Sequence, residues 1–171
     1  MPNTYTTIAS VIVGAGGTSS IDFTSIPQTY TDLVIKASIR TNRGFLSDAL
    51  AVKLNNSTTG YVSRDITYDN NNVASYADLF GAGYNLNTQG NGGTSNTFSN
   101  QEIYIPNYTG STNKSFISES TVENNAPDAR VEMMSSLWSN TSAITSIILA
   151  SYTSNTILQY STATLYGIKN S

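Results

Sequence analysis

The sequence predicts an all-β protein, a two-sheet antiparallel sandwich with jelly-roll-like connections and about 8–10 strands. Three observations lead to this fold class. Val, Ile, Thr, Tyr and Phe alternate with polar residues along nearly the whole chain, which is the period of a strand with one buried face. Clusters of Gly, Asn, Pro and Ser interrupt the alternation at short intervals. No internal repeat of fixed period is present, which disfavours a propeller or a solenoid.

The first strands are predicted at residues 6–13 (TTIASVIV) and 18–23 (TSSIDF), joined as a hairpin by GAGG. The run 33–40 alternates between apolar and polar residues, which predicts one buried and one solvated face. Runs 48–56 and 61–68 repeat this pattern. In the last of them the repeating apolar positions are Val62, Ile66 and Tyr68. We expect these three runs to be successive antiparallel strands.

Residues 69–100 break the pattern, because they are rich in Gly and Asn. We expect a long loop or insertion here, with a short helix over residues 75–80. A loop of this length inside a compact domain is usually functional. The segment is therefore the leading candidate for an interaction site.

The remaining strands are predicted at residues 99–106, 114–122, 130–139, 142–151 and 155–169. The stretch ITSIILA is apolar on both faces, which predicts a central strand covered on both sides. We expect it to pair with the final strand as a C-terminal hairpin. Phe116 and Trp138 are predicted core residues.

In the final strand, Ala163 and Leu165 are expected to enter the core. Tyr166 and Ile168 point to the other face, and we expect the edge of the second layer or a neighbouring subunit to cover them.

The length of 171 residues suits one domain, so residues 1–171 are expected to form a single β-sandwich. Only 11% of the residues are charged, against about 25% in ordinary soluble domains. The formal net charge is −3 and Lys plus Arg number eight, so no basic stripe is available for nucleic acid or for an anionic membrane. The N-terminal stretch lacks the basic region of a signal peptide, and no apolar run is long enough to cross a bilayer. We expect use in a cytoplasm or in a particle assembled there.

The sequence contains no His and no Cys, which excludes Ser-His-Asp and Cys-His nucleophilic sites and the usual zinc sites. We therefore expect no enzyme activity, no cofactor and no metal. The remaining catalytic alternative is a glycosidase-like carboxylate pair, but most of the acidic residues in the predicted strands are expected on the solvated faces. Asp65, Asp69 and the run Asn70, Asn71 and Asn72 offer oxygen ligands for calcium. Their spacing does not match an EF-hand loop, and such Asn runs are usually turns.

Loop aromatics and two arginines are the predicted partner contacts. An aromatic ring in a polar loop can anchor a protein contact or stack on a sugar. The candidate residues are Arg40, Arg43, Phe80, Tyr84, Phe98 and Tyr108.

Three phrases, IASVIVGAGGTSSIDFTSIPQTYTDLVIKASIR, DALAVKLNNSTTGYVSRDI and the closing ATLYGIKNS, resemble small virion structural proteins of tailed bacteriophages, including phages of cyanobacteria. The resemblance covers the first two-fifths of the chain and its end, and leaves the region from Asp69 to Asn113 unmatched. It implies a capsid decoration or cement protein, located in the virion, that binds the major capsid protein and associates with itself as a homotrimer. The alternative that it implies is a head- or tail-fibre module that binds carbohydrate.

Overall fold

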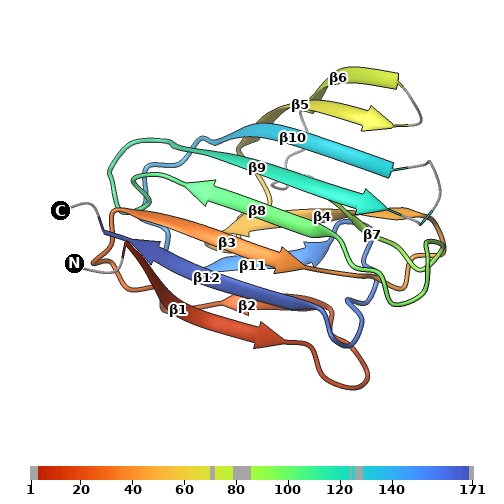
Figure 1. Ribbon diagram of the computed structural model, residues 1–171. Helices are drawn as coiled ribbons and strands as arrows, with labels where there is room; N and C mark the ends of the chain where they lie inside the picture. The colour runs from red at the N-terminus through yellow and green to blue at the C-terminus, as the bar shows by residue number, and fades with distance from the viewer. Residues whose placement is uncertain (1–3, 70–71, 79–85, 124, 126–128, 170–171) are drawn as a thin grey trace.

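The computed structural model describes residues 4–69, 72–78, 86–123, 125 and 129–169. These residues form twelve strands and no helix, so the all-β prediction is confirmed, with more strands than expected. All strand pairs are antiparallel, and the strands form one eight-stranded and one four-stranded sheet stacked as two layers (Figure 1). The jelly-roll-like connectivity stays a sequence-based prediction.

The larger sheet contains, in spatial order, β1 (Tyr5–Ile12), β12 (Thr162–Ile168), β3 (Asp32–Ser38), β8 (Asn100–Ile105), β9 (Lys114–Glu123), β10 (Ala129–Trp138), β5 (Tyr61–Asp69) and β6 (Asn72–Asp78). The smaller sheet contains β2 (Ser20–Phe23), β11 (Ile147–Ser151), β4 (Ser47–Leu54) and β7 (Leu86–Gln89). The alternation within each strand sends every second side chain into the space between the layers.

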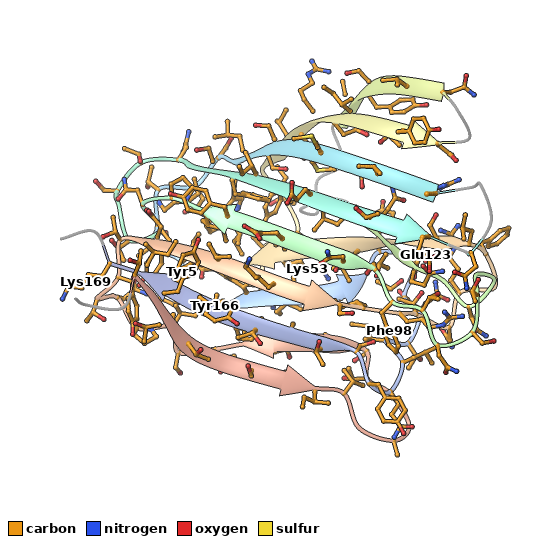
Figure 2. All side chains as sticks on the ribbon, viewed as in Figure 1. Tyr5, Lys53, Phe98, Glu123, Tyr166 and Lys169 are labelled. Atoms are coloured by element: carbon orange, nitrogen blue, oxygen red, sulfur yellow. The ribbon has the colours of Figure 1, made fainter. Side chains whose placement is uncertain are left out.

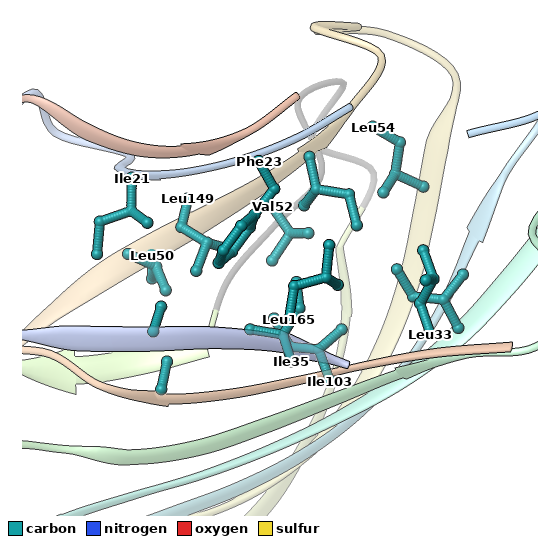
Figure 3. Packing of buried hydrophobic residues seen from close by; sticks show 14 of the residues in the cluster. Ile21, Phe23, Leu33, Ile35, Leu50, Val52, Leu54, Ile103, Leu149 and Leu165 are labelled. Atoms are coloured by element: carbon teal, nitrogen blue, oxygen red, sulfur yellow. The ribbon is translucent and has the colours of Figure 1, made fainter. Parts of the chain in front are cut away.

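The hydrophobic core fills that space with residues from both sheets (Figure 3). Ile35 and Leu165 of the larger sheet lie with Val52 and Leu149 of the smaller one, and all four are fully buried. Burial of each such side chain contributes about 1.5–3 kcal/mol relative to exposure. Phe116 and Trp138 are also buried, as predicted.

Both predicted terminal hairpins are wrong. β1 pairs with β12, whereas β2 pairs with β11 in the other layer, so the loop after β1 crosses between the sheets. Gly17 permits this crossing, because its φ is +74° and a Cβ there would lie 2.6 Å from the carbonyl oxygen of Ile157. β11 is a central strand, as predicted, but its neighbours are β2 and β4. Both ends of the chain therefore pair with strands far away in the sequence and form no local hairpin.

The middle of the chain also departs from the prediction. The runs at 33–40, 48–56 and 61–68 are not successive neighbours, because β3 pairs with β12 and β8, β4 lies in the smaller sheet, and β5 pairs with β10 and β6. The helix expected over 75–80 is wrong where the structure describes it, since residues up to Asp78 belong to strand β6. Pairing with β5 satisfies the β6 backbone. The region 69–100 therefore holds β6 and β7 rather than one long loop.

A side chain of the neighbouring strand β1 covers part of the outer face of β12. Ala163 and Leu165 enter the core, as predicted. Ile168 is also buried, and the half-buried Tyr166 ring meets Tyr5 edge-on with 6.1 Å between ring centroids (Figure 2). Tyr5 lies on the adjacent strand, so the chain itself supplies part of the cover that the sequence requires.

Candidate docking face

The outer face of β9, β10, β5 and β6 presents large apolar side chains to solvent. We call the following residues the apolar face: Val62, Ile66, Tyr68, Val73, Ile117, Val131, Met133 and Leu137. Their exposed fractions run from 37% for Tyr68 to 73% for Val73. They are eight of the fourteen large apolar or aromatic side chains that are exposed in the described part of the chain. Monomeric proteins rarely expose such a contiguous apolar patch, and one of this kind marks an interaction surface.

The strand register makes this face continuous. Ile66 on β5 lies directly opposite Met133 on β10, and Tyr68 lies opposite Val131 on the same pair of strands. On the other side of β10, Met133 lies opposite Glu119 of β9. Side chains directly opposite each other on one face are close enough to touch. The register thus joins apolar side chains across β6, β5 and β10, while Arg64, Ser135 and Glu119 lie between them and the apolar residues of the outer rows.

The same strands turn polar side chains into the sandwich. Asp65 on β5 and Glu132 on β10 are each only 5% exposed. A carboxylate oxygen of Glu132 accepts a hydrogen bond of 2.7 Å from the backbone N–H of Asn87 on β7. Arg130 forms an ion pair of 2.8 Å with Asp69 on the same side. We call these four strands the inverted half of the larger sheet: the outer positions of β5, β6 and β10 are mainly apolar, whereas the inner positions mix buried polar groups with core residues such as Phe116 and Trp138.

The polar inner side is incompletely satisfied by protein groups. Among the described residues, three buried polar atoms on these strands have no hydrogen-bond partner, namely Asp69 Oδ1, Ser120 Oγ and Arg130 Nε, and Gln101 Oε1 on the adjoining β8 is a fourth. Each buried polar group left without a partner costs about 1–3 kcal/mol. The inner side of these strands thus contributes less to the stability of the fold than a fully apolar layer would.

The predicted placement of the acidic residues is wrong at four positions. Asp32, Asp48, Asp65 and Glu132 are all buried. Asp48 accepts hydrogen bonds from the side chains of Ser151 (2.8 Å), Thr153 and Asn155. Asp32 accepts them from the Tyr104 hydroxyl and the Asn107 backbone N–H, both at 2.9 Å. Fixed donors of the protein replace water at these carboxylates, which makes their burial tolerable.

A groove of about 640 Å³ runs across the apolar face. Ile66, Ile117 and Met133 supply its apolar walls, and Arg64, Glu102 and Glu119 supply its charges. The register places Arg64 opposite Ser135 and Ser135 opposite Ile117, so small and large side chains alternate across the strands. The groove lies over the small side chain of Ser135, between these two larger side chains.

The charges of the groove are unevenly paired. Glu102 and Glu119 lie directly opposite each other on β8 and β9. Lys36 on β3 lies 2.9 Å from Glu102, and the hydrogen bond and charge of Glu102 raise the pKa of Lys36. Within the described residues neither Glu119 nor Arg64 has an ion pair or a side-chain hydrogen bond. Among the residues that the structure describes, the groove therefore carries one carboxylate and one guanidinium without an ion pair.

Of the predicted contact residues, Arg40 is buried and organises the loops at one end of the sandwich. Its guanidinium donates hydrogen bonds to the carbonyl oxygens of Thr94 (2.6 Å), Thr97 (2.8 Å) and Gly93 (3.2 Å). Burial lowers the pKa of Arg40. In place of the predicted partner contact, Arg40 holds the 90–99 loop against β3.

Arg43 and Phe98 lie at the same end and are half-buried (Figure 2 labels Phe98). The guanidinium of Arg43 lies 5.0 Å from the centre of the Phe45 ring, and one of its nitrogens is 3.6 Å from Asp48. Phe45 is exposed, and so are Tyr152 and Tyr160 in the loop that follows β11. The loops meet here, since the Asn42 N–H donates to the carbonyl oxygen of Thr156.

Tyr108 is a core residue in place of the predicted surface anchor. It is fully buried, and its hydroxyl donates a hydrogen bond to the Pro27 carbonyl oxygen. Phe80 and Tyr84 lie outside the described residues. No described member of the predicted contact set lies on the apolar face.

Sequence reasoning missed the apolar face, although the sequence carries a signal for it. In β5 and β10 adjacent residues are both apolar or aromatic: Tyr61 with Val62, Met133 with Met134, and Leu137 with Trp138. Adjacent residues of a strand point to opposite faces. Such pairs therefore indicate apolar groups on both faces of these strands.

Carboxylates are the side chains that the sequence offers for catalysis or metal binding. No group of three or more acidic side chains within the described part of the chain could hold a metal ion. Glu102 and Glu119 are the acid pair that comes closest to the glycosidase alternative, but Glu119 is exposed and the half-buried Glu102 forms an ion pair, whereas a general acid of that class uses an apolar enclosure. No described helix is long and apolar enough to cross a membrane.

Comparisons with known proteins identify no relative. No protein-family model matches the chain, and neither a curated protein nor a solved structure is significantly similar to it. The likeness to phage virion proteins stays a sequence-based prediction.

Proposed function

We propose that this protein is a structural component of a larger protein assembly, and specifically a capsid decoration protein that binds the major capsid protein on the head of a tailed phage. The observation that carries the assembly role is the apolar face, with eight large side chains exposed on four adjacent strands. The choice of a phage head rests on the sequence resemblance described above.

A protein surface suits the apolar face better than a small molecule does. The face spans four neighbouring strands, whereas a small-ligand site encloses most of its ligand in a concave pocket. The inner side of the same strands includes buried polar atoms without hydrogen-bond partners, so burial of the outer side by a partner would add stability that the inner side lacks. A protein partner would supply that cover.

The low charge of the chain supports the same role. With 11% charged residues, contacts depend on apolar burial and neutral hydrogen bonds. Salt screens ion pairs between exposed charges but has little effect on such contacts. A protein that reinforces a shell benefits from this, because its attachment persists when ionic strength changes.

Deletion of the gene from the phage that encodes the chain, followed by add-back of purified protein, tests the proposal. We expect particles without the protein to lose resistance to heat and osmotic shock and to regain it on add-back. The Ile66→Asp variant should bind heads at least tenfold more weakly, because it places a charge in the apolar face. Ile12→Asp is the matched control, since Ile12 is 74% exposed on the same sheet but outside the apolar face. Unchanged resistance of the deleted particles, together with no head binding, would overturn the capsid role.

A carbohydrate-binding fibre module is the second candidate. The observation that favours it is the group of exposed rings at the loop end, namely Phe45, Tyr152 and Tyr160. Aromatic rings of this kind stack on sugars. A glycan array separates the two candidates: binding that Tyr160→Ala abolishes would support the fibre module, and no binding to any glycan would exclude it.

A further inference from the structure

The apolar face carries charges that fit a second copy of itself. Arg64 lies on β5 and Glu119 on β9, with β10 between them. Neither has a charged partner within the described residues. Strands in a sheet lie about 4.8 Å apart, so two strand spacings and the diagonal offset separate these charges by about 12 Å. Met133 and Ser135 of β10 lie between them.

In a two-fold interface, residue i of one copy contacts residue j of the other, and the reverse contact occurs as well. A two-fold axis in the plane between two stacked faces, passing over β10 between Met133 and Ser135, brings Arg64 of each copy onto Glu119 of the other. On a flat approximation of the sheet, the same rotation places Ile66 over the Met133 region. The protruding apolar side chains of one copy then enter the groove of the other.

From this self-complementarity we propose that a second copy of this chain covers the apolar face, in a two-fold, face-to-face dimer with two reciprocal Arg64–Glu119 ion pairs. Glu102 lies directly opposite Glu119, so Arg64 of the partner copy also offsets the repulsion between these two glutamates. The inference rests on the proposed assembly role: the dimer is the unit that binds the head, through surface outside the apolar face, and Ile66→Asp then weakens head binding by breaking the dimer.

The size of the face is sufficient for a stable pair. The apolar face and the outer side of the adjoining β8, whose Glu102 lines the groove, together span five strands; a spacing of about 4.8 Å and rows of side chains extending about 27 Å along them give roughly 650 Å² per copy. The total of about 1,300 Å² falls within the range of specific protein–protein interfaces. Met133 and Ser135 lie at its centre, and the reciprocal ion pairs lie one strand to either side, within the area that the partner copy covers.

Sedimentation equilibrium of the full chain over a hundredfold concentration range tests the inference. We expect the wild-type protein to reach twice the monomer mass. Arg64→Glu and Glu119→Arg should each weaken dimerisation at least tenfold, because each brings like charges together across the interface. The double variant Arg64→Glu/Glu119→Arg should restore wild-type affinity within about threefold, since it rebuilds the pair with reversed polarity.

Lys53→Glu is the matched control. Lys53 lies on β4 of the smaller sheet, away from the apolar face, so its reversal should leave the dimer unchanged. Far-UV circular dichroism of each variant verifies that it is folded. A wild-type protein that stays monomeric, a homotrimer, or a dimer that neither single charge reversal weakens would overturn the inference.

The result is separable from the capsid role. A monomer that still binds heads, with binding lost in Ile66→Asp, would refute the dimer and leave the proposed function standing. A dimer that the charge reversals weaken but that does not bind heads would support the dimer and refute the capsid role.

Discussion

The two halves of the eight-stranded sheet place their apolar side chains differently. In β1, β12, β3 and β8 the inner positions are apolar, as at Ile35, Ile103 and Leu165, and the outer positions include Lys36 and Glu102. In β9, β10, β5 and β6 the outer positions carry the apolar face, and the inner ones include buried acids and serines. The comparison teaches that alternation identifies residues that share a face, but not which face becomes the core.

Three aromatic residues set the orientation of the inverted half. Tyr61, Phe116 and Trp138 lie on β5, β9 and β10 and point into the core. The rings of Tyr61 and Trp138 stack with 6.1 Å between their centroids, and the Leu54 N–H donates a hydrogen bond of 2.8 Å to the Tyr61 hydroxyl. Because the side-chain period of a strand is two, these anchors fix the direction of every other residue in it.

The largest expected effect comes from removal of the central anchor. Trp138→Ala should lower the free energy of unfolding by about 3–5 kcal/mol, because it leaves a cavity in the core. Leu137→Ala is the matched control on the outer side of the same strand, and it should cost less than about 1 kcal/mol in the monomer. Urea denaturation measures both values. Equal losses would contradict the assigned orientation of β10.

The polar interior of the inverted half should show a smaller but clear cost. Glu132→Ala leaves the partly buried N–H of Asn87 without its carboxylate acceptor, so we expect a loss of about 1–3 kcal/mol. Glu119→Ala, at an outer position, should change stability by less than about 0.5 kcal/mol. The same denaturation experiment compares them. A Glu132 variant as stable as the Glu119 variant would mean that the inner acid is dispensable.

High pH tests the Tyr61 anchor. Burial raises the pKa of Tyr61 to about 12, whereas the unfolded residue loses its proton near its ordinary value of 10.0. Its contribution is therefore fully present below about pH 10 and is lost as pH rises toward about 12, since only the unfolded state releases the proton in that window. Tyr61→Phe should make the decline of stability between these pH values less steep. Identical slopes in wild type and variant would place Tyr61 outside the core.

The smallest expected effect is at the apolar face itself. In the monomer, Ile66→Ser should alter the free energy of unfolding by less than about 0.5 kcal/mol, because Ile66 is already exposed. Ile35→Ser, at a fully buried position of the other half, is the contrasting variant and should destabilise strongly. A large loss at Ile66 in dilute solution would show that the face is covered within a single chain.

The local sequence pattern was sufficient to predict where many strands lie, but not which strands pair with each other. The alternation at residues 33–40 and the apolar stretch that became β11 predicted strands correctly, because burial on one or both faces leaves a direct trace in the sequence. The partners of β1 and β11 could not be predicted, since their pairing depends on contacts with segments far away in the sequence. The helix expected over 75–80 failed for the same reason, because β5 recruits these residues as a strand.

The candidate site was less predictable than the fold. Arg40 and Tyr108 are of residue types that often make protein contacts, but tertiary packing buries both. Ile66 was recognised as part of a regular apolar pattern, and such a pattern is ordinarily assigned to the core. Only the anchors at Tyr61 and Trp138 reverse that assignment, and their effect depends on three strands meeting in register.

Oxidation of two adjacent methionines tests the central claim most directly. Met133 is 60% exposed on the apolar face, and Met134 is 3% exposed on the inner side of the same strand. Under mild peroxide treatment with peptide mass spectrometry, we expect Met133 of the dilute monomer to oxidise much faster than Met134. In the assembled state the rate at Met133 should fall to near that of Met134. Equal rates in the monomer, or a Met133 that stays fully reactive in the assembly, would contradict the account.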